Sequence, residues 1–436
     1  MKKSYKFLVS LSLLGLVGLA GCGKKESGSG DEGEKTVIRV GTWEGGDPYK
    51  IQQAIAAEYM KDNPDVEIKV ESVPDQYATK ILTQIAGGQA PDIYQIGDGD
   101  VSMFQSKGAL VDLTDFMTTG ENQLNLDDFY GNVLDIGKID DKYYTMPKDF
   151  TTYNVFYNKK MFDEAGIEYP TDDWTWEEFR EIAIKLTKKD GEEFVHWGAN
   201  LMEPSIRPNL PLIYGYGGNV ISDDGQTVEG IMNSDETKEA IRFYNQMKNI
   251  DKVAPTSVQS EAFSGADLFL SGKAAMNVMG IWPLQKYIDA ELDFGVVKSP
   301  KGPEGQYNSI AYAGYGIYSK SKNQEEAWKY LKYLSTKGQE KLAEHALSAY
   351  IPVSESSGQT SDVHKKVFID AIDDIKMFPE RLNFNFGKTA GEAMTSGVFA
   401  EIASETDGKF DTDTALDTAA KEGQKLMDQA MAEDKE

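Results

Sequence analysis

The sequence predicts an α/β protein organised in two lobes, and three observations lead to this fold class. Between residues 36 and 97 the chain alternates between strand-like and helix-like segments, which is typical of a parallel sheet with helices on its faces. The same alternation resumes after residue 151 with different residues. Beyond its N-terminal segment the chain has about four hundred residues of ordinary apolar content, so two cores are favoured over one.

The first sheet is predicted from five consecutive segments. TVIRVGTW opens it and is rich in β-branched residues, as strands are. The next segment places Ile51, Ile55 and Tyr59 on one helical face and stops at Asn63 and Pro64. We expect strands at 36–43, 65–73 and 91–97, and helices at 47–64 and 76–89.

The middle of the chain repeats this α/β pattern. Thr175 and Glu178 form an expected capping box at the start of a helix. Gly272 marks a turn between a helix and a strand that ends at Trp282. We expect strands within 151–158, 273–282, 292–305 and 309–319, helices within 175–189, 234–249, 261–271 and 323–336, and a mostly helical C-terminal part.

The only cysteine, Cys22, stands between an apolar run and a polar segment. Three lysines precede the apolar stretch 7–20, which is too short for a comfortable permanent membrane span. The letters LAGC (19–22) resemble the lipobox of bacterial lipoproteins, in which the cysteine becomes the lipid-modified first residue. We therefore expect a signal peptide at 1–21, lipidation of Cys22 and a flexible tether at 22–35; the alternative is an ordinary secretion signal with a chance cysteine.

The net negative charge of the chain excludes one class of binding partner. The formal charge of −26 becomes −29 without residues 1–21, because that segment carries three lysines and no acid. An acidic surface repels phosphate, so nucleic acid is excluded as a partner. After the signal peptide no apolar run approaches eighteen residues, so we expect the remainder to be soluble.

Aromatic and acidic residues stand where predicted strands end. The first strand is followed by Trp43 and Glu44, and the middle region has Trp282 in the same situation. Asp98 and Asp100 follow the third strand. Ligands of open parallel sheets bind beyond these strand ends, and a sugar packs its C–H face on aromatic rings while its hydroxyls donate to carboxylates. A neutral polyol therefore fits this set, although either tryptophan could belong to the core and both aspartates could be turn formers.

Four segments together resemble the extracellular solute-binding proteins of ATP-driven importers, in the class that binds maltose-like and other oligosaccharides. They lie at 91–116, 146–167, 262–282 and 313–335. The resemblance covers nearly the whole chain after the signal peptide. It implies a clamp of the periplasmic-binding-protein type (type II), with a parallel-dominated sheet flanked by helices in each lobe and a hinge between them. The implied layout is lobe 1 at 36–148 and 299–345, lobe 2 at 149–298 and 346–436, and crossings near 148–149, 297–298 and 346–352.

The same resemblance implies a set of ligand-binding residues. They are Trp43, Glu44, Asp98 or Asp100, Asp149, Trp282, Tyr312, Tyr315 and Arg381. The segment 196–219 matches no family position that can be transferred, so its Arg207, Tyr214, Tyr216 and Asn219 are further candidates for tuning which sugar is bound. No cofactor and no metal ion is expected.

The function implied by the resemblance is that of a substrate-binding lipoprotein of an ABC transporter. It would capture a sugar, namely an oligosaccharide, at the extracellular face of the cell membrane and deliver it to the membrane permease. It would act as a monomer, held to the membrane surface by its lipid and without enzymatic activity.

Two alternatives stay open at this point. A clamp for another solute, such as a polyamine, would also use carboxylates and aromatic rings. A secreted glycosidase needs an acid and a nucleophile, and no motif marks such a pair. The three histidines lack the spacing of zinc ligands, and 410–420 begins like an EF-hand loop but lacks its glycine and closing glutamate, so we expect a helix start there.

Overall fold

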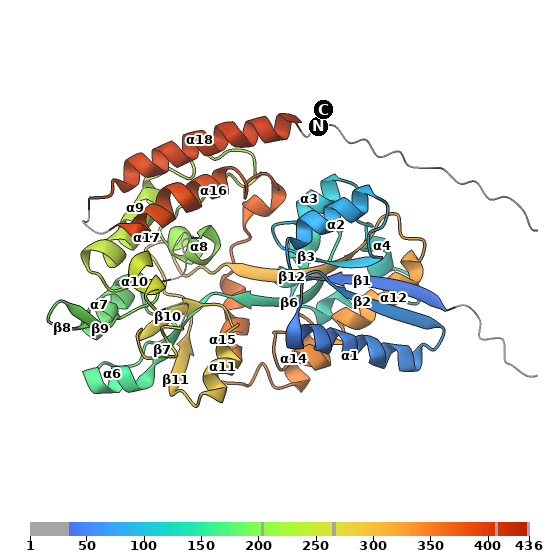
Figure 1. Cartoon of the computed structure of the whole chain (residues 1–436), viewed down its shortest axis with the longest axis horizontal. Helices are drawn as coiled ribbons and strands as arrows, with labels where there is room; N and C mark the ends of the chain where they lie inside the picture. Colours follow the sequence, from blue (N-terminus) through green and yellow to red (C-terminus); the bar gives the residue numbers. More distant parts are fainter. Residues whose placement is uncertain (1–34, 202–204, 264–266, 406–408, 434–436) are drawn as a thin grey trace, which may run out of the picture.

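The computed structural model describes residues 35–201, 205–263, 267–405 and 409–433. Figure 1 shows two lobes side by side, joined in the middle by segments that run between them. The first lobe contains a five-stranded sheet and the second a three-stranded sheet. Buried apolar side chains form two clusters on the first sheet and one large cluster that fills the second lobe. The prediction of a two-lobed α/β protein is confirmed.

Five strands form the first sheet: β1 (Thr36–Thr42), β2 (Val66–Ser72), β3 (Ile93–Gly97), β6 (Met146–Thr152) and β12 (Ile310–Ile317). Their order is β2-β1-β3-β12-β6. β1 pairs in parallel with β2 and β3, as the alternating segments predict. β12 comes from late in the chain and pairs antiparallel with β3 and β6.

The helices of the first lobe are α1 (Gly46–Asp62), α2 (Tyr77–Ala86), α3 (Val101–Ser106), α4 (Thr114–Thr118), α5 (Gly131–Leu134), α12 (Gln324–Ser335), α13 (Gln339–Leu342) and α14 (Ile351–Ser356). α1 and α12 bury Ile55, Trp328 and Leu331 against one face of the sheet. α2 and α3 bury Ile81 and Phe104 against the other face. A short hairpin of β4 (Lys138–Ile139) and β5 (Lys142–Tyr143) lies beside them.

The second sheet is formed by β7 (Asn154–Asn158), β10 (Met276–Met279) and β11 (Phe294–Val297). β7 lies in the centre and pairs antiparallel with both neighbours, whereas parallel-dominated pairing was expected. Parallel pairing is limited to isolated bridges: Trp197 pairs with Ala274, two residues before β10, and Asn200 pairs with Asn277 of β10. Only Tyr153 separates β6 from β7, so the chain passes directly from the first sheet into the second.

Helices surround the second sheet. They are α6 (Lys159–Ala165), α7 (Trp176–Leu186), α8 (Ile206–Gly215), α9 (Asp235–Asn245), α10 (Ser257–Glu261), α11 (Leu284–Asp289), α15 (Lys365–Asp370), α16 (Ala390–Met394), α17 (Ala400–Ser404) and α18 (Thr412–Glu433), with a hairpin of β8 (Lys188–Asp190) and β9 (Glu193–His196). The capping box of Thr175 and Glu178 is confirmed at α7. The expected helix start near 410 is confirmed by α18, where Asp411 accepts from the backbone N–H of Thr414. The expectation of a helix within 261–271 is wrong for the described residues: α10 ends at Glu261, and the described part of 262–271 contains turns.

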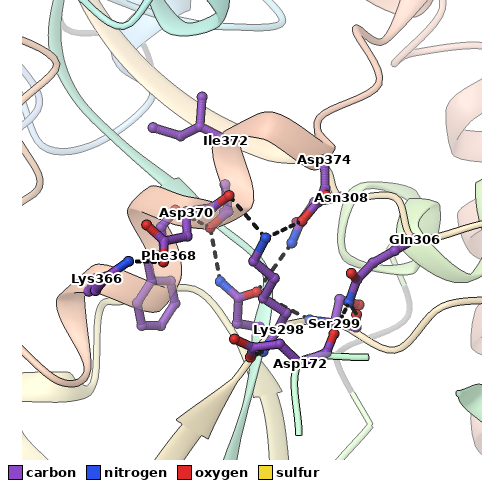
Figure 2. A network of polar contacts seen from close by, with 12 residues as sticks. Asp172, Lys298, Ser299, Gln306, Asn308, Lys366, Phe368, Asp370, Ile372 and Asp374 are labelled. Carbon is purple, nitrogen blue, oxygen red and sulfur yellow. Dashed lines mark hydrogen bonds and ion pairs between the residues drawn. The ribbon is translucent and has the colours of Figure 1, made fainter. Parts of the chain in front are cut away.

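Three segments cross between the lobes and are linked by hydrogen bonds. Asn308 is 1% exposed and binds the backbone of Tyr153 through both ends of its amide, each at 2.9 Å. Figure 2 shows the ammonium group of Lys298 held by the carboxylate of Asp374 at 2.8 Å and the carbonyl of Asp370 at 3.1 Å. The crossing segments are thereby fixed to one another at the point where the lobes join.

Two of the predicted boundaries between the lobes do not coincide with the ends of helices or strands, or with the lobe that these elements contact. The position between 148 and 149 falls inside β6, which runs on to Thr152 in the first sheet. The segment after 346 was expected in the second lobe, yet Tyr350 forms a bridge with Phe129, and Tyr130 donates to Ser354 at 3.2 Å. These contacts place α14 on the first lobe, because its aromatic neighbours belong to that core.

Candidate ligand-binding site

A cavity of about 420 Å³ lies between the lobes. The first lobe contributes residues from the end of β1, from β6 and from β12, and the second contributes the segment after β10. The lining residues are Trp43, Glu44, Pro48, Ile51, Gln52, Lys148, Asp149, Phe150, Thr151, Ile281, Trp282, Ala311, Tyr312, Ala313, Leu342, His345 and Ala346. The structure thus brings five of the predicted residues to one cavity: Trp43, Glu44, Asp149, Trp282 and Tyr312.

The indole of Trp43 is fixed at the end of β1 by an aromatic neighbour. It meets the ring of Tyr77 edge to face, with 5.3 Å between centroids. Tyr77 is itself held, since its hydroxyl donates to the carbonyl of Gly41 and accepts from the N–H of Gln95. The apolar wall on this side of the cavity is therefore rigid before any ligand arrives.

A lysine between two carboxylates forms the charged part of the cavity. The ammonium of Lys148 lies 2.8 Å from Glu44 Oε1 and 2.6 Å from Asp149 Oδ2, and its side chain is 6% exposed. Burial alone would lower the pKa of Lys148, but the charges of Asp149 and Glu44 outweigh it and raise that pKa. The three groups carry a net charge of −1 and leave carboxylate oxygens available to accept from hydroxyl groups.

A chain of buried polar groups holds Glu44 in place. Gln95 donates from Nε2 to Glu44 Oε1 at 3.3 Å, and Thr42 donates to Gln95 Oε1 at 2.5 Å. Gln52 donates to the same Thr42 hydroxyl at 3.1 Å. Because each group in the chain is satisfied, the carboxylate position is determined by the first lobe alone.

The wall from the second lobe is Trp282, whose side chain is 58% exposed. Its ring meets Tyr153 edge to face at 5.9 Å, and the preceding N–H of Ile281 donates to Thr151 Oγ1 at 2.8 Å. Gly280 is required here, because a Cβ would lie 2.6 Å from the indole of Trp282. The exposed face of this ring is offered to a ligand from the lobe opposite Trp43.

Tyrosines 312 and 315 have different surroundings. Tyr312 lines the cavity, and its hydroxyl lies 2.9 Å from Thr145 Oγ1. Tyr315 was predicted to bind ligand, but it is 1% exposed within the core of the first lobe. Its position on β12 turns it toward the helices that cover the sheet, so its contact with ligand is not supported.

Asp98, Asp100 and Arg381 lie outside this cavity. Asp98 accepts from Arg207 Nη1 at 2.8 Å and Asp100 lies beside it, with a pKa raised by burial and by the charge of Asp98. Arg381 donates to the carbonyl of Lys138 at 2.7 Å. The prediction that these three face the same ligand as Trp43 does not agree with the geometry, because none of them lines this cavity.

The four candidate residues from segment 196–219 lie in different surroundings. Tyr214 is buried in the second core, and Tyr216 donates to Glu177 at 3.0 Å. Asn219 accepts from the N–H of Val220. Only Arg207 reaches toward the first lobe. Sequence analysis did not identify Lys148, Gln52, Thr151 and His345 as residues of the cavity. The one signal available for them was the position of Lys148 next to Asp149, which was predicted to bind ligand.

A family model described as bacterial extracellular solute-binding protein matches residues 42–341. The chain belongs to this family. As a solute-binding protein it binds its target without chemical conversion, and it is not an enzyme. Among the described residues, no helix is both long enough and apolar enough to cross a bilayer.

This solute-binding protein is similar to several known proteins. It is 29% identical over 341 residues to the maltotriose-binding protein of Pyrococcus abyssi, covering 75% of this chain and 67% of that protein. The ABC substrate-binding protein of Listeria monocytogenes in complex with cycloalternan has the same fold, with a TM-score of 0.75, 24% identity and coverage of 91% and 99%. So does UgpB from Mycobacterium tuberculosis in complex with glycerophosphocholine, with a TM-score of 0.78, 17% identity and coverage of 91% and 100%.

Proposed function

We propose that this protein is the substrate-binding lipoprotein of an ABC transporter and that it captures a sugar, namely an oligosaccharide, for delivery to a membrane permease. The observation that carries the proposal is the pair of indoles on opposite lobes, Trp43 and Trp282, beside the carboxylates of Glu44 and Asp149. Aromatic faces pack against the C–H faces of sugar rings, and carboxylates accept from their hydroxyls. The printed ligands of two similar proteins, maltotriose and cycloalternan, support a saccharide.

The proposed mechanism is closure of the two lobes on the ligand. Residues of both lobes line one cavity, so a ligand between them binds the closed arrangement better than an open one and shifts the population toward it. We propose that the two lobes move as two bodies, with β6 as far as Thr152 and α14 belonging to the first. The closed form is what a permease would recognise.

We also propose that lipid on Cys22 holds the protein at the extracellular face of the cell membrane. Cys22, the signal peptide and nearly all of the tether lie outside the described residues, so this proposal rests on the LAGC letters. A single acyl chain binds a membrane only marginally, so more than one chain is expected. Anchoring raises the local concentration of a monomer near its permease.

A non-sugar solute is the second candidate, and one observation favours it. The cavity groups carry a net charge of −1, which would attract a cation such as a polyamine. UgpB, which has a similar fold, was solved in complex with glycerophosphocholine, so this fold also accommodates solutes other than oligosaccharides. A glycosidase is not favoured, because Glu44 and Asp149 share one lysine partner and neither is set apart as an acid.

Thermal unfolding against a panel of ligands tests the proposal. A ligand that binds only the native state raises the melting temperature. We expect an increase with oligosaccharides and none with polyamines, peptides or divalent metal ions. An increase with a polyamine alone would contradict the sugar assignment while leaving the two-lobed receptor intact.

A further inference from the structure

The space between the lobes is divided into two cavities. The second has a volume of about 410 Å³ and lies at the end of β3, facing the start of α8 and the segment that leads into α16. It shares no lining residue with the first cavity. Its lining residues are Gly97, Asp98, Gly99, Asp100, Ser205, Ile206, Arg207, Asn383, Phe384, Phe386, Gly387, Lys388, Gly391 and Thr395.

An ion pair between the lobes lies where the two cavities approach each other. Asp98 Oδ2 from the first lobe accepts from Arg207 Nη1 of the second at 2.8 Å, and also from the backbone N–H of Tyr312 at 3.1 Å. Tyr312 lines the first cavity, whereas Asp98 and Arg207 line the second. The hydrogen bond between Tyr312 and Asp98 therefore connects the linings of the two cavities.

Further contacts hold the arginine side chain in this layer. Its Nη1 donates to the carbonyl of Ile310 at 3.1 Å, and its guanidinium lies 3.9 Å from the ring centre of Phe378. The backbone carbonyl of Arg207 accepts from Ser309 Oγ at 2.7 Å. Arg207 is therefore fixed against β12 and the residue before it from several directions.

We propose that the Asp98–Arg207 pair closes one end of the first cavity and limits the length of the oligosaccharide that the protein binds. The inference rests on the proposed sugar-binding function. Beyond the pair, the second cavity offers the rings of Phe384 and Phe386 together with Asp100 and Lys388, which are group types that sugar units contact. Removing the bulk of the pair would join the two spaces and admit a longer chain.

Two double variants separate the effect of lost side-chain volume from the effect of lost charge. Asp98→Ala with Arg207→Ala removes both bulk and charge. Asp98→Asn with Arg207→Gln removes the charges and keeps most of the bulk, since only the end of the arginine side chain is lost, so it is the control. Calorimetry would measure the dissociation constant of each protein for α-1,4-linked and β-1,4-linked glucose oligosaccharides, from disaccharide to heptasaccharide.

We expect the alanine variant to improve its affinity for hexasaccharide relative to trisaccharide by about tenfold, and the neutral control to keep the wild-type ratio. If the alanine double variant does not fold, Arg207→Ala alone keeps Asp98 and its bond to Tyr312, and the same direction is expected. An alanine variant that keeps the wild-type length preference overturns the inference. An equal loss of affinity for every oligosaccharide length in both variants also overturns it, because the ion pair would then stabilise the closed arrangement of the lobes without selecting length. A wild-type protein that binds none of these sugars but melts higher with a non-sugar solute overturns the proposed function as well.

Discussion

At the scale of single residues, the cavity depends on one buried cation between two anions. The ammonium group of Lys148 contacts the carboxylates of both Glu44 and Asp149. These two contacts offset the free-energy cost of burying the lysine. A sugar hydroxyl can then bind to oxygens whose positions are already fixed. The arrangement favours neutral polyols, since adding a further anion would meet a net negative charge.

Replacing this lysine tests its structural role. Lys148→Met leaves two carboxylates without their cation, and we expect the free energy of unfolding to fall by about 3 kcal/mol, measured by urea denaturation. Adding Glu44→Gln and Asp149→Asn should restore much of the loss. Lys50→Met, at an exposed ion pair with Asp47, is the control and should change little. Equal effects of Lys148→Met and the control would refute the role.

The second prediction at this scale concerns the indole of the second lobe. Trp282→Ala should weaken sugar binding at least about tenfold, because the ligand loses an aromatic face, and should leave the fold intact because the ring is 58% exposed. Calorimetry and melting measure the two effects. Tyr169→Ala removes a ring of similar exposure outside the cavity and should not change affinity. Unchanged affinity in Trp282→Ala would remove this residue from the site.

At the scale of elements, the crossing segments are joined by a few fully buried polar side chains. Asn308 binds the backbone of Tyr153 in both directions, and its Oδ1 also accepts from the N–H of Ser309. Such bonds fix the segments relative to one another while leaving their backbone dihedrals free to adjust elsewhere. The crossing is therefore a defined joint between two bodies rather than a flexible linker.

Asn308→Ala tests this joint. It leaves the N–H and the carbonyl of Tyr153 unsatisfied in a buried position, so we expect the free energy of unfolding to fall by about 2 to 3 kcal/mol. Gln306→Ala, which removes an amide at the half-buried edge of the same network, should cost less. Chemical denaturation compares the two variants, and an equal or smaller loss for Asn308→Ala would show that its bonds do not hold the crossing.

A buried lysine in the π-helical turn after α9, η3 (Gln246–Ile250), predicts a pH effect. Burial lowers the pKa of Lys248 from 10.5 to about 8. The unfolded chain then binds more protons between pH 8 and 10.5, so wild-type stability should rise over this window. Lys248→Met should remove that rise and add about 3 kcal/mol at pH 7, whereas Lys421→Met on the surface of α18 should not. A flat stability difference between wild type and Lys248→Met from pH 7 to 10.5 would contradict this.

At the scale of the whole molecule, two bodies share one cleft and carry strong negative charge. The largest buried cluster fills the second lobe and extends to Phe150 and Ile310 of the first sheet, whereas a separate cluster lies within the first lobe. The formal charge of the chain is −26, and a net charge far from zero favours solubility. Capture of a solute outside the cell agrees with this architecture.

The proposed anchor gives a prediction at this scale. Cys22→Ala should either release the protein into the medium or leave an uncleaved signal peptide, because no thiol remains to be lipidated. Cell fractionation with mass spectrometry of the N-terminus measures both outcomes. Mature variant protein that remains at the membrane would refute the anchor.

The sequence by itself determined the elements whose cause is local. The strand, helix, strand order from 36 to 97, the capping box at Thr175 and the helix start near 411 depend on neighbours within a few residues, and the structure contains them. The positions of Trp43, Glu44 and Trp282 at strand ends were likewise predictable, since a strand that ends must present its next residues at the sheet edge.

Only the tertiary structure decided which of these residues meet. Lys148 contacts Glu44 from 104 positions away, and Arg207 forms an ion pair with Asp98 across 109 positions. Tyr315 differs from Tyr312 because of the sheet face it occupies, which depends on the helices packed there. The antiparallel pairing of β7 joins it to β10 and β11, which come much later in the chain. Such long-range pairings arise from packing and charge compensation between distant segments, which no local pattern encodes.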